Sequence, residues 1–280
     1  TMGRVALPEL KAYGYAGGFS TATLAAGGTL GILIPPSVVL VIYAILAEQN
    51  ISKLFLAAFV PGIMAALGYM VAVSIYVRLY PDRAGTRAQV PYKDRFRALA
   101  KVWSVVVIFL LVIFGIAGDW NWAKSGTQAL FTPTEGAAVG AFGVGLIAWR
   151  SGGLTWSSLI DSFLVTGRSS AMIFFIILGA GFYNGFLSLT QVPQEIAGWV
   201  VNQGLSPMGI LLLILLFYLL LGCLMDSLSM ILLTVPIFFP VIMSLDFALA
   251  PEHLAIWFGI LVLIVVEVGL ITPPVGLNLF

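Results

Sequence analysis

Two pairs of consecutive prolines stand inside strongly apolar runs of the chain. The first lies in GTLGILIPPS at residues 28–37, and the second in EVGLITPPVG at residues 267–276. A prolyl nitrogen cannot donate a hydrogen bond to the carbonyl four residues earlier, so each pair interrupts a helix. The carbonyls that lose their usual donors are those of Gly31, Ile32, Gly269 and Leu270. Unsatisfied carbonyls are costly in hydrocarbon, so the two breaks predict cation sites.

The composition places these breaks in a membrane. Of 280 residues, 60% are hydrophobic and 9% are charged, whereas a soluble domain carries about 25% charged residues. We therefore expect an all-α, polytopic membrane protein. The single cysteine, Cys223, and the single histidine, His253, cannot form a disulfide framework or a cluster of ligands for a transition metal. The aspartates do not pair within apolar runs, so we expect no enzyme active site.

Basic residues orient the apolar runs. Seven of the 13 lysines and arginines fall between residues 78 and 101, and the positive-inside rule places that loop in the cytoplasm. Asp82 and Asp94 within it argue against nucleic acid as a partner. We expect membrane segments of alternating direction at residues 19–46, 52–79, 102–118, 133–149 and 170–190. Between the last two, residues 150–168 have the spacing of an amphipathic helix on the membrane surface.

The apolar run at residues 207–245 is too long for one span of about 20 residues and too short for two spans and a turn. A re-entrant helical hairpin fits this length. Its tip is expected at residues 222–229, which hold the only charge of the run, Asp226. Pro236 and Pro240 are expected to bend the returning arm.

The two broken helices are expected to form an inverted repeat. A glycine precedes each proline pair by the same spacing, Gly31 in the first and Gly269 in the second, and the charge argument gives the two helices opposite directions. Secondary transporters place substrate and ion sites between such repeats. Residues 1–11 are then the returning arm of a first hairpin, and the chain is expected to be a fragment of a longer protein. The predicted divisions are the end of the first repeat (1–48), a scaffold helix with the basic loop (49–101), further scaffold helices (102–206), and the second hairpin with the second broken helix (207–280).

Motifs along almost the whole chain resemble the large membrane subunit of tripartite ATP-independent periplasmic (TRAP) transporters. They are MGRVALPEL from Met2, Gly14-Tyr15, residues 28–37, Pro61-Gly62, FTPTE at 131–135, Gly222 with Asp226, Pro236, Pro240, and residues 269–278. The resemblance implies sodium-driven uptake of organic acids, such as C4-dicarboxylates or sialic acid, across a bacterial inner membrane by an elevator mechanism. It implies sodium as the coupling ion with no other cofactor, and two partners: a small membrane subunit and a periplasmic substrate-binding protein.

The resemblance also implies two sodium sites, each between a hairpin tip and a broken helix. Its first site uses carbonyls around Gly31, Ile34 and Pro36, and its second uses Gly269, Thr272 and Val275 with the tip near Gly222. Thr272 adds a hydroxyl oxygen, a hard ligand suited to a hard cation.

Five polar residues beside the breaks and tips are candidates to face an anionic substrate, because the amino ends of half-helices present positive dipole ends. They are Ser37, Asp226, Ser227, Ser229 and Asn278. Ser, Asn and Asp at such places are also ordinary helix caps, and both readings stay open. Glu267 is either a packing residue or a proton or cation site. The alternatives to the TRAP function are a sodium/dicarboxylate symporter that needs no binding protein and, more remotely, a channel or an intramembrane enzyme.

Overall fold

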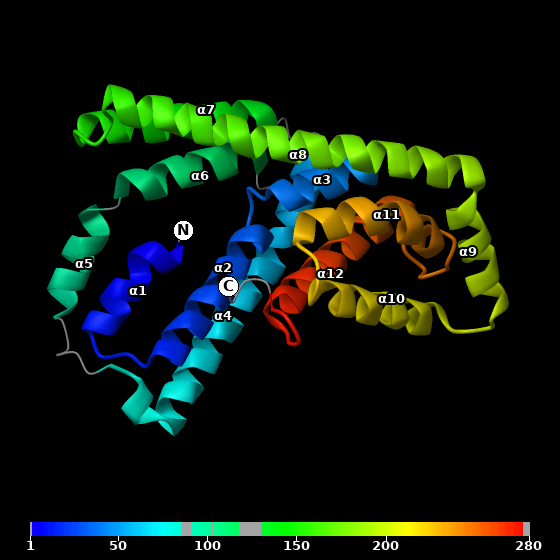
Figure 1. The fold of residues 1–280 in the computed structure, drawn as a ribbon, viewed down its shortest axis with the longest axis horizontal. Coiled ribbons are helices and arrows are strands. Elements are labelled where there is room, and N and C mark those ends of the chain that lie inside the picture. The colour runs from blue at the N-terminus through cyan, green and yellow to red at the C-terminus, as the bar shows by residue number, and fades with distance from the viewer. Residues whose placement is uncertain (1, 86–90, 102, 118–129, 277–280) are drawn as a thin grey trace. The chain divides into compact units, whose positions relative to one another are not determined.

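The computed structural model describes residues 2–85, 91–101, 103–117 and 130–276. All regular structure in these ranges is helical (Figure 1), which confirms the all-α prediction. The chain divides into two compact units. One combines Thr1–Arg87 with Gly179–Phe280, and the other is Ala88–Leu178.

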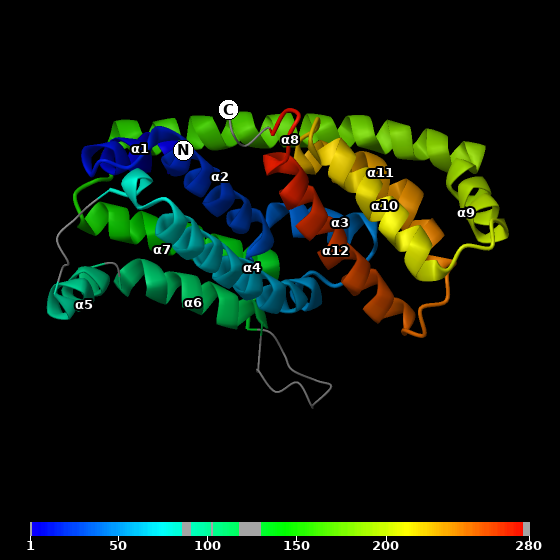
Figure 2. The ribbon, with the colours of Figure 1, turned by 90° about the horizontal axis from the view of Figure 1, so that it is seen from below.

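The first unit is organised around α12 (Pro251–Ile271), the most buried long helix among those described. On one side α12 packs against α2 (Gly17–Leu33) and α4 (Ile51–Leu79), and on the other against α10 (Pro207–Gly222) and α11 (Ser227–Met243). Figure 2 shows α12 lying between these two helix pairs. The unit also contains α1 (Met2–Ala12), α3 (Val38–Leu46), the short 3-10 helix η1 (Pro81–Arg83) and α9 (Val192–Asn202).

The first proline pair breaks its helix where the sequence predicts. Helix α2 ends at Leu33, α3 begins at Val38, and the two are bent by 42°. The local cause is the residue before each proline pair, because a residue that precedes proline is pushed out of the helical region. Ile34 has φ −82° and ψ 123°, and Thr272 has φ −91° and ψ 137°. Both proline pairs are joined by a cis peptide bond. The residue before the proline pair is thus extended at both breaks.

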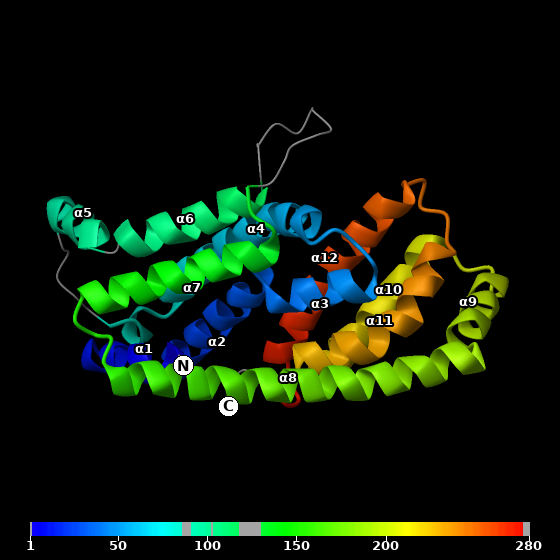
Figure 3. The same ribbon diagram turned by 90° about the horizontal axis from the view of Figure 1, so that it is seen from above.

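The apolar run at residues 207–245 forms the expected hairpin. Its arms, α10 and α11, have 16 and 17 residues, which gives each a length of about 25 Å. A hydrocarbon core is about 30 Å thick, so each arm is short for a full span. Pro236 and Pro240 both lie within the continuous helix α11. Figure 3 shows α11 beside α3, so the second hairpin packs against the first broken helix.

Three described helices are long and apolar enough to cross a membrane: α4, α12 and α8 (Trp156–Thr190). The α2–α3 pair counts as a fourth if the bent pair is one span. The 35 residues of α8 join the predicted surface helix and the predicted span without interruption. No proline stands between residues 156 and 190, so nothing in the local sequence ends the helix there.

The second unit contains α5 (Tyr92–Lys101), α6 (Trp103–Ala117), α7 (Pro133–Arg150) and the first part of α8. Helices α6 and α7 pack closely through glycines: Gly136 lies against Ile116, and Gly143 against Ile108. Because the earlier residue of α7 meets the later residue of α6, the two helices are antiparallel. Helix α7 starts at Pro133, where the expected segment 133–149 begins, and the Thr132 and Glu135 side chains form a capping box.

Candidate functional site

The tip of the second hairpin touches α12 at the start of the second break. A methyl group added at Gly222 would lie 2.9 Å from Gly269 Cα, and one added at Gly269 would lie 2.7 Å from Gly222 Cα. Carbon atoms in ordinary contact are about 3.5–4.0 Å apart, so only glycine fits at both positions. The backbones of two predicted ligand residues, 47 positions apart in sequence, therefore lie in direct contact.

Cys223 provides a second link between the tip and the break. The side chain is buried, with 3% exposed, and its Sγ lies 3.3 Å from the carbonyl oxygen of Pro273 and 3.2 Å from that of Leu219, so the single thiol proton has two acceptors. Sequence reasoning did not identify this contact. Its only signal in the sequence is the position of the cysteine directly after Gly222 in the expected tip.

The hydrogen bonds at the second break differ from the prediction at one carbonyl. The Gly269 carbonyl is not free, because it accepts a hydrogen bond of 3.0 Å from the Thr272 N–H. The Thr272 hydroxyl donates to the Val268 carbonyl at 2.5 Å, which occupies the acceptor that the N–H would use in a regular helix. The Thr272 hydroxyl thus takes the Val268 carbonyl, and the Thr272 N–H bonds to the carbonyl of the next residue, Gly269. A carbonyl oxygen has a second lone pair, so Gly269 can still contact a cation.

At the first break the Gly31 carbonyl lacks a donor among the described residues, as the sequence predicts. The Ile34 N–H donates to the Leu30 carbonyl at 2.9 Å, as in a regular helix. Within the described ranges no donor reaches the Gly31 carbonyl. Gly62 of α4 packs on Ile34, since a methyl group there would lie 3.0 Å from Ile34 Cγ1. Pro36 at this break and Val275 at the other are both exposed.

The candidate substrate residues include two helix caps. Asp226 is the N-cap of α11 and accepts a 3.0 Å hydrogen bond from the Ser229 N–H. Ser37 is the N-cap of α3 and accepts a bond from the Leu40 N–H at 3.4 Å. Ser227 is buried, and Asn278 lies outside the described residues. Asp226 and Ser37 are therefore helix caps, and each lies at the amino end of a half-helix.

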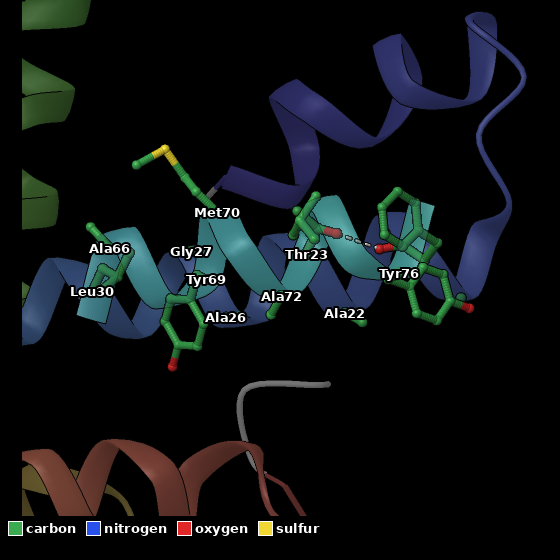
Figure 4. A pocket seen from close by; sticks show the side chains of 13 residues that line it. Ala22, Thr23, Ala26, Gly27, Leu30, Ala66, Tyr69, Met70, Ala72 and Tyr76 are labelled. Carbon is green, nitrogen blue, oxygen red and sulfur yellow. Dashed lines mark hydrogen bonds between the residues drawn. The ribbon is translucent and has the colours of Figure 1, made fainter. Parts of the chain in front are cut away.

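A large groove lies between α2 and α4, with a volume of about 640 Å³. Figure 4 shows its lining, which includes Ala22, Ala26, Leu30 and Met70. The Thr23 hydroxyl at this groove donates to the Phe19 carbonyl at 2.8 Å. The lining is almost entirely apolar and has no charged side chain, so it does not have the chemistry of an organic-acid site.

Charged groups in the first unit are few. Lys53 at the start of α4 forms an exposed ion pair with Glu252 at the start of α12. Glu267 is 4% exposed, and its two carboxylate oxygens have no hydrogen-bond partner in the described part of the chain. Among the described residues there is no group of three or more His, Cys, Asp or Glu side chains that could hold a metal ion.

Comparisons with known proteins agree with this architecture. The family model described as "Tripartite ATP-independent periplasmic transporter, DctM component" matches residues 1–280. The C4-dicarboxylate TRAP transporter large permease protein DctM of Pseudomonas aeruginosa is 36% identical over 282 residues, which cover all of this chain and 61% of that protein.

Two further relatives carry other substrate names. The isethionate TRAP transporter permease protein DctMQ of Oleidesulfovibrio alaskensis is 30% identical, and the match covers all of this chain and 41% of that protein. The sialic acid TRAP transporter large permease protein SiaM of Vibrio cholerae is 29% identical, with coverage of 100% and 61%. The chain thus spans about two fifths to three fifths of the length of these relatives. It is a multi-pass membrane protein that belongs to the DctM component family of the TRAP transporters.

Proposed function

We propose that the chain is part of the large permease subunit of a sodium-coupled TRAP transporter in a bacterial inner membrane. Its substrate is an organic acid, and its partners are a small membrane subunit and a periplasmic substrate-binding protein. The observation that carries the proposal is the contact between Gly222 at the hairpin tip and Gly269 at the helix break. This arrangement brings irregular backbone, with its carbonyl oxygens, to one place within an apolar unit.

Sodium is held at the second break by the Gly269 and Val275 carbonyls, the Thr272 hydroxyl and the tip at Gly222. The Thr272 proton is donated to Val268, which leaves the lone pairs of its oxygen for a cation. The other sodium site, at the first break, is formed by the Gly31 carbonyl together with carbonyls around Ile34 and Pro36.

The substrate carboxylate is bound by the amino ends of α3 and α11. Each carries a polar cap, Ser37 or Asp226, and the helix dipole favours negative charge at these ends. Ser227, Ser229 and Asn278 are the further candidates for contact with substrate. The acidic cap at Asp226 opposes an anion, so we place the carboxylate nearer Ser37 than Asp226.

Transport proceeds by an elevator movement in which the hairpins and broken helices move together against scaffold helices, including α4 and the α6–α7 pair. The relatives named for C4-dicarboxylate, sialic acid and isethionate support a small organic acid as the substrate class.

The test is uptake of radioactive C4-dicarboxylate into proteoliposomes that contain the whole transporter, with its binding protein outside. Replacement of sodium by choline should abolish uptake, and unchanged uptake in choline would rule out sodium coupling. Uptake that is equally fast without the binding protein would instead support the symporter that needs none. Flux that does not saturate with substrate would support a channel.

Thr272→Val should raise the sodium concentration for half-maximal uptake by about tenfold or less, which corresponds to one lost neutral ligand. Thr272→Ser keeps the hydroxyl and serves as the matched control. An unchanged sodium dependence in Thr272→Val would remove Thr272 from the site.

A further inference from the structure

A small cavity lies where α2, α4 and α12 meet, one helical turn before each proline break. Its volume is about 60 Å³, enough for an ion and an accompanying water. Its polar lining consists of Thr29 from α2, Tyr69 from α4 and Glu267 from α12, and the remaining lining is apolar. Glu267 and Gly269 are two residues apart on a helix that turns about 100° per residue. They therefore point to roughly opposite faces of α12, and the cavity is separate from the Gly222–Gly269 contact.

Glu267 forms no ion pair with any described residue. Its carboxylate is 4% exposed, and neither oxygen accepts a hydrogen bond within the described ranges. Removal of an unpaired carboxylate from water is strongly unfavourable. The carboxylate is therefore neutralised either by a proton or by a bound cation, and the groups around it bear on which.

The neighbouring helices provide no such charge. Helices α2, α3, α10 and α11 contain no Asp, Glu, Lys, Arg or His. On α4, Lys53 is paired with Glu252, and Arg78 lies nine residues beyond Tyr69, about 13 Å along the helix.

The buried tyrosines of two of these helices are already engaged. The Tyr43 hydroxyl donates to the Ala255 carbonyl at 2.6 Å. The Tyr218 hydroxyl lies 2.7 Å from Thr234 Oγ1, which also bonds to the Met230 carbonyl at 2.7 Å. Neither tyrosine lines the cavity of Glu267.

The two hydroxyls of the cavity are placed as oxygen ligands. Thr29 is 1% exposed, and its hydroxyl donates to the Ala26 carbonyl at 2.8 Å, which leaves its lone pairs available. Thr29 Oγ1 lies 3.4 Å from the Tyr69 hydroxyl oxygen. In Figure 4 the Tyr69 hydroxyl points away from α4, toward the side on which α12 lies.

We propose that Glu267, Thr29 and Tyr69 form a binding site for one small monovalent cation, for which sodium is the probe. A monovalent ion neutralises the single carboxylate, whereas a divalent ion would leave an uncompensated charge in the membrane. Hydroxyl and carboxylate oxygens are hard ligands that suit an alkali cation. This site is additional to the two at the proline breaks, and it does not depend on the transport activity proposed above.

The experiment counts bound sodium. The whole transporter, with its small subunit, is purified and equilibrated with radioactive sodium at constant ionic strength set by choline. Glu267→Gln should bind one sodium ion fewer per transporter than the unmodified protein. Thr29→Val and Tyr69→Phe keep the carboxylate and should raise the half-saturating sodium concentration of this site about three- to tenfold.

The chain offers matched controls for both hydroxyl variants. Thr23→Val removes the same group from α2, where the Thr23 hydroxyl donates to the Phe19 carbonyl within the same helix. Tyr76→Phe removes the same group from α4, where the Tyr76 hydroxyl accepts from Arg83 at 2.9 Å. Both controls should leave sodium binding unchanged.

An equal number of sodium ions bound by the unmodified protein and by Glu267→Gln would overturn the proposal and identify Glu267 as a neutral packing residue. If Glu267→Gln does not fold, Thr29→Val and Tyr69→Phe test the proposal instead. Half-saturating sodium concentrations equal to those of Thr23→Val and Tyr76→Phe would overturn the proposal. Sodium binding at the second break is tested separately by Thr272→Val. The two sites can therefore be confirmed or rejected independently of each other.

Discussion

A methyl group at the contact between the hairpin tip and the second break should separate the two elements. Gly222→Ala places a carbon 2.9 Å from Gly269 Cα and 3.3 Å from the Val266 carbonyl oxygen. Gly269→Ala places a carbon 2.7 Å from Gly222 Cα and 3.2 Å from the Leu219 carbonyl oxygen. All of these neighbours are backbone atoms, which cannot move aside by a change of rotamer.

The expected cost follows from these distances. Normal carbon contacts require about 3.5–4.0 Å, so either methyl group forces the backbones apart by roughly 1 Å. Overpacking of this kind costs about 1–3 kcal/mol. It outweighs the gain of about 0.5–1 kcal/mol that Gly→Ala brings in a helix with free space. Each variant is therefore expected to be less stable and to lose part of its stabilisation by sodium.

The assay is unfolding of the purified transporter in nanodiscs, with sodium or with choline. Gly68→Ala on α4 is the matched control, because a methyl group at Gly68 meets no atom within 4 Å. The control should be as stable as the unmodified protein or slightly more stable, and it should keep its full response to sodium.

The double variant tests the contact itself. Once the backbones have separated for one methyl group, the second finds room, so the combined cost of Gly222→Ala and Gly269→Ala should be smaller than the sum of the two. Single variants that behave like Gly68→Ala, or costs that simply add, would show that the tip and the break do not touch as described.

Three further predictions concern the tip and the second unit. Asp226→Ala should destabilise the transporter by about 0.5–2 kcal/mol in an unfolding assay, whereas Asp226→Asn, an equally good cap, should not; equal loss in both would mean that the charge matters beyond capping. Cys223 is the only cysteine of the chain and is buried against Pro273. If sodium holds the tip against the break, it should slow alkylation of Cys223 by a maleimide. A rate of alkylation that does not depend on sodium would contradict this closure. Thr132→Ala removes the side-chain bond to the Glu135 N–H and should also cost about 0.5–2 kcal/mol; stability equal to that of Thr132→Ser would argue against the capping box.

The elements that carry the site could be predicted from local sequence. Pro35 and Pro273 force the preceding residue out of the helical region, and both breaks occur at those places. The hairpin tip was predicted from the length of an apolar run and from its lone charge, Asp226. Each of these features depends on a few neighbouring residues, because helix formation, capping and interruption are governed by hydrogen bonds across one turn.

Other features required the tertiary structure. The Gly269 carbonyl was expected to be free, yet it accepts from Thr272, because the Thr272 hydroxyl takes the neighbouring carbonyl and moves the backbone bond. The direct contact of Gly222 with Gly269 was likewise not contained in either segment alone. Glu267 stood in the sequence as either a packing residue or an ion site, and only the packing of α2 and α4 on α12 placed Thr29 and Tyr69 beside it.

The membrane class, the two breaks and the hairpin could thus be predicted from local sequence, since they follow from apolar length and from the missing N–H of proline. The tertiary structure decided which carbonyls stay unpaired, which glycines touch and which groups surround the buried carboxylate. The physical reason is distance along the chain: a break is made by adjacent residues, whereas a binding site is made by helices that are far apart in sequence and meet only when their apolar faces pack.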